Sequence, residues 1–256
     1  MKTDLLEVDG RRIEYLKLDG DPTRPTLVLL HEGLGCVALW RDFPARLAAA
    51  TGHPVFVYSR LGYGGSDPEP WPWPLDYMQR EGREVLPRVL AAAHIEASIL
   101  IGHSDGASIA LVHAATTGKP AVRGVVAMAP HVFAEACGLD SIAVVREQYE
   151  SGLRDKLAKY HGQNVDCAFR GWSESWLNPQ FQHWNLESFL PALTAPVLLI
   201  QGVDDQYGTA RQLEAIAAGV AGPCETHLLE DCRHAPQFEQ AERTLALIAG
   251  FVVGLT

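Results

Sequence analysis

The stretch Ile99-Leu100-Ile101-Gly102-His103-Ser104-Asp105-Gly106 leads from an apolar run into a Gly-x-Ser-x-Gly motif. Small and apolar residues follow at 107–112, so we interpret the stretch as a strand, a sharp turn and a helix. Glycines on both sides leave room for the crowded backbone of such a turn. Ser104 is then a candidate nucleophile, and the backbone N–H of Asp105, at the helix N-terminus, can face a developing oxyanion. Only partner residues elsewhere in the chain can distinguish this arrangement from a tight turn without chemistry.

The composition suits one large α/β domain with an inserted subdomain, since 256 residues, 47% of them hydrophobic, can bury a sizeable core. A net charge of −10 without a Lys/Arg cluster argues against nucleic acid as a partner. Residues 1–12 lack the pattern of a signal peptide, and the apolar tail at 245–255 is too short to span a bilayer. With five scattered cysteines interpreted as reduced thiols, we expect a cytoplasmic protein without a membrane partner. The oligomeric state is not defined by the sequence.

Strand-like and helix-like segments alternate along most of the chain, which is typical of a doubly wound sheet. We predict strands at residues 5–8, 13–18, 26–30, 55–59, 98–102, 124–129, 197–201 and 226–229, and helices at 43–50, 76–93, 107–117, 209–218 and 239–253. The central strands are continuous apolar runs, as expected of parallel strands that are buried on both faces. The predicted fold is therefore α/β, with a mostly parallel central sheet, helices on both faces and an opening hairpin at Asp9-Gly10.

The alternation stops in residues 131–190, which are helical in character and rich in charge and aromatic side chains. We expect a helical lid there, inserted into a core domain of residues 1–130 and 191–256, because the segment exceeds an ordinary connection. Five side chains are candidates for lining an apolar substrate pocket under this lid: Leu34, His131, Trp172, Trp176 and Trp184. The tryptophans could equally form the core of the lid itself.

A serine nucleophile requires a base, and the base requires an orienting acid. His234 follows the predicted strand at 226–229, and Asp204 and Asp205 follow the strand at 197–201. The carboxyl ends of parallel strands meet at one edge, where ligand sites of such sheets form. The order Ser, Asp, His matches a triad built on successive strand ends. We favour Asp205 over Asp204 as the acid.

The other histidines compete less well for the role of base. His103 precedes the candidate nucleophile and is expected to point toward the core. His131 and His183 fall at or inside the lid and could line a pocket, whereas His161 is predicted to be a surface residue of the lid.

The loop His31-Glu32-Gly33-Leu34-Gly35 follows a predicted strand and offers backbone N–H groups at the same edge. Together with the N–H of Asp105, one of them would complete a two-donor oxyanion hole. By itself, such a loop is no more than a glycine-rich strand exit.

These motifs resemble the α/β-hydrolase fold superfamily, in particular its lid-bearing small esterases and C–C bond hydrolases, over nearly the full length. The resemblance rests on the motif around Ser104 and on the segments His31-Glu32-Gly33-Leu34-Gly35, Ser59-Arg60-Leu61-Gly62-Tyr63-Gly64-Gly65-Ser66, Gly202-Val203-Asp204-Asp205 and Cys232-Arg233-His234. It implies Asp205 as the acid and Gly33 as the oxyanion donor. One departure is Glu32, where the family commonly has glycine, so Leu34 stays open as the donor. Glu32 either brings a carboxyl group near the pocket or faces solvent or an ion pair.

The sequence therefore predicts hydrolysis of a small, apolar or aromatic ester through an acyl-enzyme, with Ser104, His234 and Asp205 as the triad. C–C bond hydrolysis and lactone hydrolysis would use the same residues and remain open. An alternative of another class is a ligand-binding protein that keeps the fold without turnover. No metal or organic cofactor is expected, because no ligand cluster and no phosphate-binding loop is visible.

Overall fold

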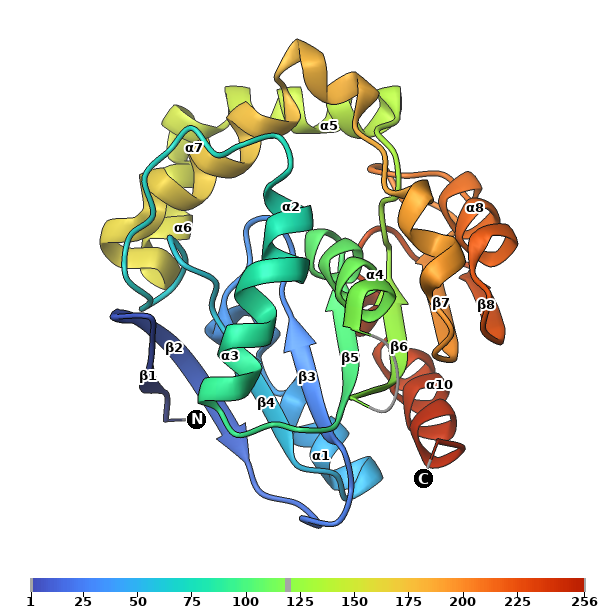
Figure 1. Ribbon diagram of the computed structural model, residues 1–256. Coiled ribbons are helices and arrows are strands. Elements are labelled where there is room, and N and C mark those ends of the chain that lie inside the picture. Colours follow the sequence, from blue (N-terminus) through green and yellow to red (C-terminus); the bar gives the residue numbers. More distant parts are fainter. Residues whose placement is uncertain (1, 118–120, 256) are drawn as a thin grey trace.

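The computed structural model describes residues 2–117 and 121–255 and is built around an eight-stranded sheet (Figure 1). Its spatial order is β1-β2-β4-β3-β5-β6-β7-β8. The strands are β1 (Asp4–Val8), β2 (Arg11–Leu18), β3 (Thr26–Leu30), β4 (Val55–Tyr58), β5 (Ser98–His103), β6 (Val122–Met128), β7 (Val197–Gly202) and β8 (Cys224–Leu229). Each predicted strand is confirmed, with shifts only at the ends.

The first two strands form the predicted hairpin, and Asp9 and Gly10 at its turn both have positive φ, +51° and +76°. Such left-handed backbone at two successive positions matches the twist of a tight hairpin. Strand β2 also pairs antiparallel with β4, whereas every later neighbouring pair is parallel. The mostly parallel sheet is therefore confirmed.

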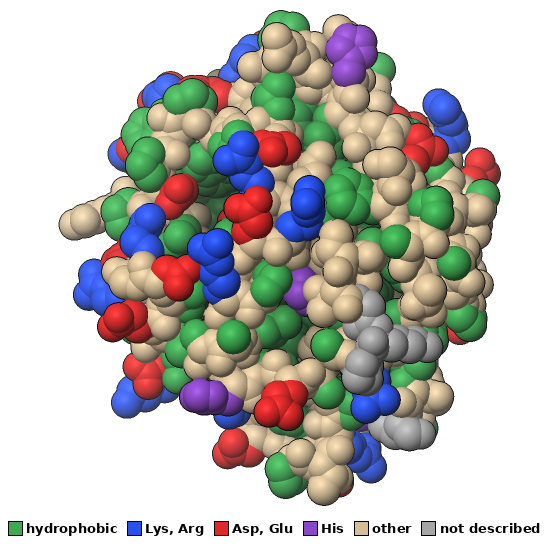
Figure 2. All heavy atoms as spheres, in the orientation of Figure 1, with side chains coloured by type: hydrophobic (Ala, Val, Ile, Leu, Met, Phe, Trp, Pro, Cys, Tyr) green, Lys and Arg blue, Asp and Glu red, His purple; other side chains and the backbone are tan. Residues whose placement is uncertain are grey.

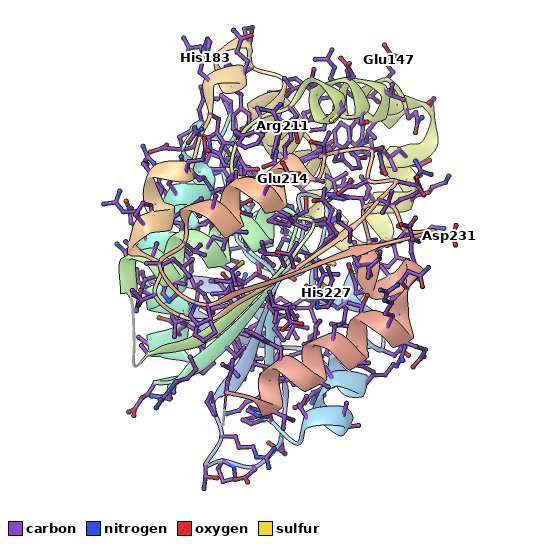
Figure 3. All side chains as sticks on the ribbon, turned by 90° about the vertical axis from the view of Figure 1, so that its right-hand side faces the viewer. Glu147, His183, Arg211, Glu214, His227 and Asp231 are labelled. Carbon is purple, nitrogen blue, oxygen red and sulfur yellow. The ribbon has the colours of Figure 1, made fainter. Side chains whose placement is uncertain are left out.

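Helices cover both faces of the sheet. On one face α1 (Phe43–Thr51) packs against α10 (Ala241–Val253), and Figure 3 shows the two side by side. The other face carries α2 (Tyr77–Arg80), α3 (Leu86–Ala92), α4 (Asp105–Thr117) and α8 (Arg211–Gly219), while α9 (Pro236–Glu239) leads into α10. Successive residues of β3 point to opposite faces of the sheet. Leu27 and Leu29 pack with α1 and α10, and Val28 packs with the helices on the other face. This alternation follows from the two-residue period of a strand.

The helix predicted at 76–93 is interrupted by a π-helical turn at Glu81–Val85, between α2 and α3. Gly82 in this turn lies against α4, where a Cβ atom would come within 2.8 Å of the Ile109 carbonyl oxygen. The Gly82 carbonyl accepts a hydrogen bond from Nδ1 of His113 at 2.9 Å. A π turn frees a carbonyl from the helical pattern, and His113 satisfies it here.

Between β6 and β7 the chain forms α5 (Ala136–Glu147), α6 (Arg154–His161) and α7 (Val165–Trp176). Short turns of 3₁₀ or π helix connect them and continue to β7: Tyr149–Leu153, Gly162–Asn164, Pro179–His183 and Glu187–Ala192. Figure 1 shows α5, α6 and α7 above the carboxyl ends of the parallel strands, and the Glu187–Ala192 turn packs against α4 and α8. The division into a core (1–130, 191–256) and a lid (131–190) remains a prediction.

The surface carries charges of both signs. On the face drawn in Figure 2, basic and acidic side chains are interspersed. Among the helices of residues 2–117 and 121–255, none has both the length and the apolar character required to cross a membrane.

One further element, the short 3₁₀ turn Val37–Trp40, follows β3 and buries Trp40 against α1.

Candidate active site

Ser104 occupies a strained turn between β5 and α4, with φ at +53°. Its N–H donates to the Met128 carbonyl at 2.9 Å, and its own carbonyl accepts from Ala107 N at 2.9 Å. Gly106 lies against β3, since a Cβ there would come within 2.0 Å of the Leu30 carbonyl oxygen. Only a residue without a side chain fits this approach, which explains the glycine of the motif. Left-handed backbone at a non-glycine residue is costly and is typical of functional turns.

Asp205 and His234 meet across two neighbouring loops. His234 Nδ1 donates to Asp205 Oδ1 at 2.8 Å. Asp205 lies three residues beyond the end of β7 and His234 lies on the loop after β8. The Val203 N–H donates to the Leu229 carbonyl at 2.9 Å, which extends the β7–β8 pairing toward this contact. The sequence prediction that both residues lie at the carboxyl edge is confirmed.

The carboxylate of Asp205 is fully enclosed, with 1% of its side chain exposed. Oδ1 also accepts from the Tyr207 N–H at 2.9 Å, and Oδ2 accepts from Gln201 Nε2 at 3.0 Å. Burial alone would raise the pKa of Asp205, but the charge and hydrogen bond of His234 outweigh it and hold the pKa below its usual value. The carboxylate is therefore ionised and suited to stabilise an imidazolium. Asp204, by contrast, is exposed.

Hydrogen bonds to the carbonyl groups fix the orientation of the peptide groups in the loop after β3. The Glu32 carbonyl accepts from His31 Nδ1 at 2.7 Å and from Gly35 N at 3.1 Å. Because a trans peptide directs its C=O and N–H to opposite sides, the Gly33 N–H points away from these donors. The next carbonyl, that of Gly33, accepts from the Tyr63 hydroxyl at 2.8 Å, so the Leu34 N–H points away from Tyr63. A Cβ on Gly33 would lie 2.2 Å from Nε1 of Trp172, so this position requires glycine.

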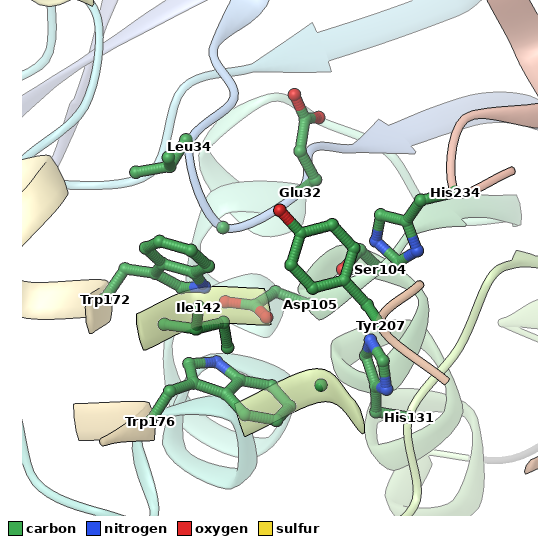
Figure 4. A pocket seen from close by; sticks show the side chains of 12 residues that line it. Glu32, Leu34, Ser104, Asp105, His131, Ile142, Trp172, Trp176, Tyr207 and His234 are labelled. Atoms are coloured by element: carbon green, nitrogen blue, oxygen red, sulfur yellow. The ribbon is translucent and has the colours of Figure 1, made fainter. Parts of the chain in front are cut away.

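A cavity of about 140 Å³ brings these groups together (Figure 4). Ser104, Asp105 and His234 line it from the core, while α5 and α7 close it from above. Its full lining is Glu32, Gly33, Leu34, Ser104, Asp105, His131, Gly138, Ile142, Trp172, Trp176, Tyr207 and His234. The loop glycine, the motif serine and the candidate base thus line the same cavity.

Of the aromatic residues expected in the pocket, Trp172 and Trp176 line the cavity, and Trp184 does not. The first two lie one turn apart on α7 and so share a face of that helix. Trp184 lies beyond the helix and packs behind Trp176, with ring centroids 5.7 Å apart. It stacks on Phe181 and donates from Nε1 to Gln79 Oε1 at 3.2 Å. For Trp184 the pocket prediction is therefore wrong.

Both readings of Glu32 apply at once: it lines the cavity, and its Oε2 lies 3.5 Å from His103 Nδ1. Burial opposes ionisation, but the hydrogen bond and charge of His103 outweigh it and lower the pKa of Glu32 to about 2. His103 in turn donates from Nε2 to the His234 carbonyl at 2.8 Å. The pair thus connects the loop after β3 to the loop of the candidate base.

The remaining histidines divide into three cases. His131 lines the cavity with its ring centroid 5.8 Å from that of His234, and burial first, then the charge of His234, lowers its pKa to about 3. His183 is exposed and points away from the molecule (Figure 3). The surface prediction for His161 is wrong, because it is buried and donates from Nε2 to the Leu34 carbonyl at 3.1 Å.

Sequence reasoning missed several lining groups: Tyr207, Gly138, Ile142 and the side chain of Asp105. Tyr207 had a signal, since it follows the candidate acid by two residues on the same loop. Its ring centroid lies 4.6 Å from that of His234. Ile142 is one apolar residue among many on α5, and its sequence position carries no comparable signal.

Comparison with known proteins identifies the family of this chain. A model described as the alpha/beta hydrolase family matches residues 27–247. The chain belongs to the alpha/beta hydrolase family. The α/β-hydrolase resemblance and the fold class drawn from the sequence are thereby confirmed, and hydrolase activity is the function that the family supports.

Individual relatives of this hydrolase are distant. A proline iminopeptidase of Heyndrickxia coagulans is 23% identical, over 96% of this chain and 97% of the relative. An esterase from Exiguobacterium antarcticum superposes with a TM-score of 0.77 at 18% identity, covering 97% of this chain and 98% of the esterase. The enol-lactonase from Burkholderia xenovorans LB400 gives 0.73 at 17% identity, covering 98% of this chain and all (100%) of the lactonase. At these identities the two structures show the shared fold.

Proposed function

We propose that this chain is a serine hydrolase that cleaves a small-molecule ester through an acyl-enzyme. The observation that carries the proposal is the 2.8 Å hydrogen bond from His234 Nδ1 to the buried Asp205 carboxylate, in the cavity that Ser104 also lines. A nucleophile on a strained turn, a histidine and an orienting carboxylate form the constellation required for acyl transfer. The triad is Ser104, His234 and Asp205.

In the first step His234 accepts the proton of Ser104 while Oγ attacks the carbonyl carbon of the ester. Since Nδ1 donates to Asp205, Nε2 is the nitrogen left to act as the base. Asp205 stabilises the imidazolium that forms. The oxyanion is bound by the backbone N–H groups of Gly33 and Asp105, each contributing about 3 kcal/mol of barrier lowering.

Collapse of the tetrahedral intermediate breaks the ester bond, and His234 returns its proton to the departing alcohol. Water then enters, loses a proton to His234 and attacks the acyl-enzyme. The second tetrahedral intermediate then collapses: the bond between the acyl carbon and Ser104 Oγ breaks, His234 returns its proton to Oγ, and the acid is released. The cavity of about 140 Å³ and its indole walls favour a small acyl group with apolar surface.

A fluorophosphonate probe tests the proposal directly, because it labels an activated serine. We expect labelling of the wild type and of Ser188→Ala, a control at an exposed serine, and no labelling of Ser104→Ala. p-Nitrophenyl acetate hydrolysis should follow the same pattern. An unlabelled wild type, or a labelled Ser104→Ala variant, would overturn the proposal.

A further inference from the structure

His131 takes no part in the reaction described above, although its side chain lines the same cavity. The residue is 4% exposed, and neither ring nitrogen has a hydrogen-bond partner among the described residues. Each of the other buried histidines forms a ring hydrogen bond within the protein: His31, His53, His103, His113 and His161. A buried polar group without a partner requires an explanation, and here the cavity is the place where a partner can bind.

The ring nitrogens of His131 are accessible from the cavity. They are not among the unpaired atoms that the fold encloses completely, such as Oδ1 of Asp105. Figure 4 shows a ring nitrogen of His131 directed toward the part of the cavity that Ser104 and His234 line. A ligand bound beside the candidate nucleophile can therefore form a hydrogen bond with this ring.

The position of His131 is fixed by α4, the helix that begins next to Ser104. The Ser108 hydroxyl donates to the His131 carbonyl at 2.6 Å and accepts from its N–H at 3.2 Å. The Ser108 N–H in turn donates to the Ser104 carbonyl at 3.1 Å, so one helical turn holds both the imidazole and the nucleophile. The ring also packs edge to face with Trp176, with centroids 5.2 Å apart. His131 is thus a fixed part of the cavity wall.

The ring of His131 is uncharged, which determines the kind of group that it binds. Burial first, and then the charge of His234, lowers the pKa of His131 to about 3. Within the described residues, no lysine or arginine lines the cavity to bind an anion. A cation finds no free carboxylate beside this ring, because Asp105 is enclosed and Glu32 pairs with His103. A neutral imidazole has one donor and one acceptor, and a hydroxyl group, which also donates and accepts, pairs with either tautomer.

His131 lies on the side of the cavity from which the leaving group departs. His234 returns its proton to the departing alcohol, so the ester oxygen of that alcohol lies next to His234. The ring centroids of His131 and His234 are 5.8 Å apart, and Figure 4 shows both across the cavity from Leu34 and Trp172. Two rings at this separation suit two oxygen atoms that are joined by two carbons, as in the monoester of a 1,2-diol.

We propose that the substrate is a monoester of a 1,2-diol, and that the free hydroxyl of its alcohol part binds the imidazole of His131. Hydrolysis then yields the acid and the diol, and His131 transfers no proton. The inference rests on the proposed function for its scissile ester. The hydroxyl site itself can be tested with ethers, which have no acyl bond to cleave.

Binding is measured first, by quenching of tryptophan fluorescence in the wild type. The two ligands, 2-phenoxyethanol and propyl phenyl ether, differ by exchange of a hydroxyl for a methyl group. Burial of an unpaired hydroxyl is costly, so a cavity without a partner for it favours the propyl ether. We expect the wild type to bind 2-phenoxyethanol at least as tightly as the propyl ether. Tighter binding of the propyl ether overturns the proposal.

His131→Phe then locates the site. Phenylalanine keeps a planar ring against Trp176 but removes both nitrogens, so the ratio of the two dissociation constants should shift by about tenfold toward the propyl ether. His183→Phe, at an exposed histidine, is the matched control and should leave the ratio unchanged. An unchanged ratio in His131→Phe overturns the assignment to His131. If His131→Phe does not fold, as judged by circular dichroism, the two ethers on the wild type still decide whether a hydroxyl is recognised.

Turnover distinguishes the two sides of the ester. One pair, 2-hydroxyethyl acetate and propyl acetate, exchanges hydroxyl for methyl in the alcohol, and a second pair, ethyl glycolate and ethyl propanoate, does so in the acyl group. Each rate is divided by that of the ester's uncatalysed hydrolysis. We expect His131→Phe to lower kcat/KM for 2-hydroxyethyl acetate relative to propyl acetate by about tenfold, and to leave the ratio of the acyl pair unchanged.

Two results of these rate measurements overturn the assignment of the hydroxyl to the leaving group. One is no shift in either pair, and the other is a shift of the acyl pair that equals or exceeds that of the alcohol pair. If the wild type cleaves none of these esters, the hydrolase proposal fails, and the binding of the two ethers still judges the hydroxyl site.

Discussion

A Cβ atom on Gly202 would lie 2.1 Å from the carbonyl oxygen of Cys232, so the loops after β7 and β8 touch backbone to backbone. The Asp204 N–H donates to the same carbonyl at 2.9 Å. This contact fixes the separation of the two loops and thereby the 2.8 Å hydrogen bond between Asp205 and His234. A glycine next to the acid loop is therefore part of the geometry of the site.

Gly202→Ala should separate these loops. We expect the free energy of unfolding, from urea titration, to fall by about 1–3 kcal/mol, because the added methyl group overpacks against backbone that cannot retract. Ester hydrolysis should fall as well. Gly250→Ala is the control, since a Cβ there meets nothing within 4 Å, and helix propensity favours alanine. Equal stability and activity of the two variants would contradict the argument.

Asp205→Asn should lower kcat for p-nitrophenyl esters by about 10⁴-fold, because the amide no longer stabilises the imidazolium and favours the wrong tautomer. Asp204→Asn, at the exposed neighbouring position, should leave kcat unchanged. Steady-state kinetics at pH near 7 measure both. Comparable losses in the two variants would reject the choice of Asp205 as the acid.

The elements of the sheet were predictable because buried parallel strands are continuous apolar runs. The apolar stretch of β7 and the glycine that ends it predict both the strand and the place of Asp205. The π turn at Glu81–Val85 was not predictable, since it depends on Gly82 packing against a helix elsewhere in the chain. Long-range packing leaves little trace in local sequence.

In the candidate site, too, local sequence predicts some features, and others depend on long-range packing. Ser104, Asp205 and His234 follow from position, because strand ends meet at one edge of the sheet. The residues of the cavity walls cannot be predicted in this way, because they depend on how α5 and α7 pack over that edge. Trp172 and Trp176 share a helical face and line the cavity, whereas Trp184, with the same side chain, lies behind them. The sequence around His161 is polar, so it gives no sign that this side chain is buried against the loop after β3.

Glu32→Gln should make stability less sensitive to acid. The pKa of Glu32 is held at about 2, below its ordinary value of 4.5, so its ion pair with His103 stabilises the fold above about pH 4.5 and is lost as pH falls toward 2. At neutral pH the variant should be less stable by up to about 3 kcal/mol, and the difference should shrink in acid. Urea unfolding between about pH 2 and 6 measures it. A difference that stays constant over this range would show that the ion pair does not contribute, and exposed Glu96→Gln supplies the control.

His161→Ala should destabilise the loop after β3, although His161 itself lies on α6. His161 Nδ1 accepts from the Gly64 N–H and Nε2 donates to the Leu34 carbonyl, both at 3.1 Å, so one buried ring connects α6 to the loop that carries Gly33. Removing it leaves a buried N–H of Gly64 and a half-buried carbonyl of Leu34 unpaired, at a cost of up to about 1–3 kcal/mol each in the free energy of unfolding.

If the ring also positions the oxyanion donors, kcat for p-nitrophenyl acetate should fall by about tenfold or more while KM changes little, because the donors act on the transition state. His183→Ala, at an exposed position of the same insertion, should change neither stability nor kcat. A variant at His161 that loses stability but keeps kcat would limit this histidine to holding α6 in place. The ratio of kcat between the two variants, measured well below the unfolding temperature of both, separates the two roles.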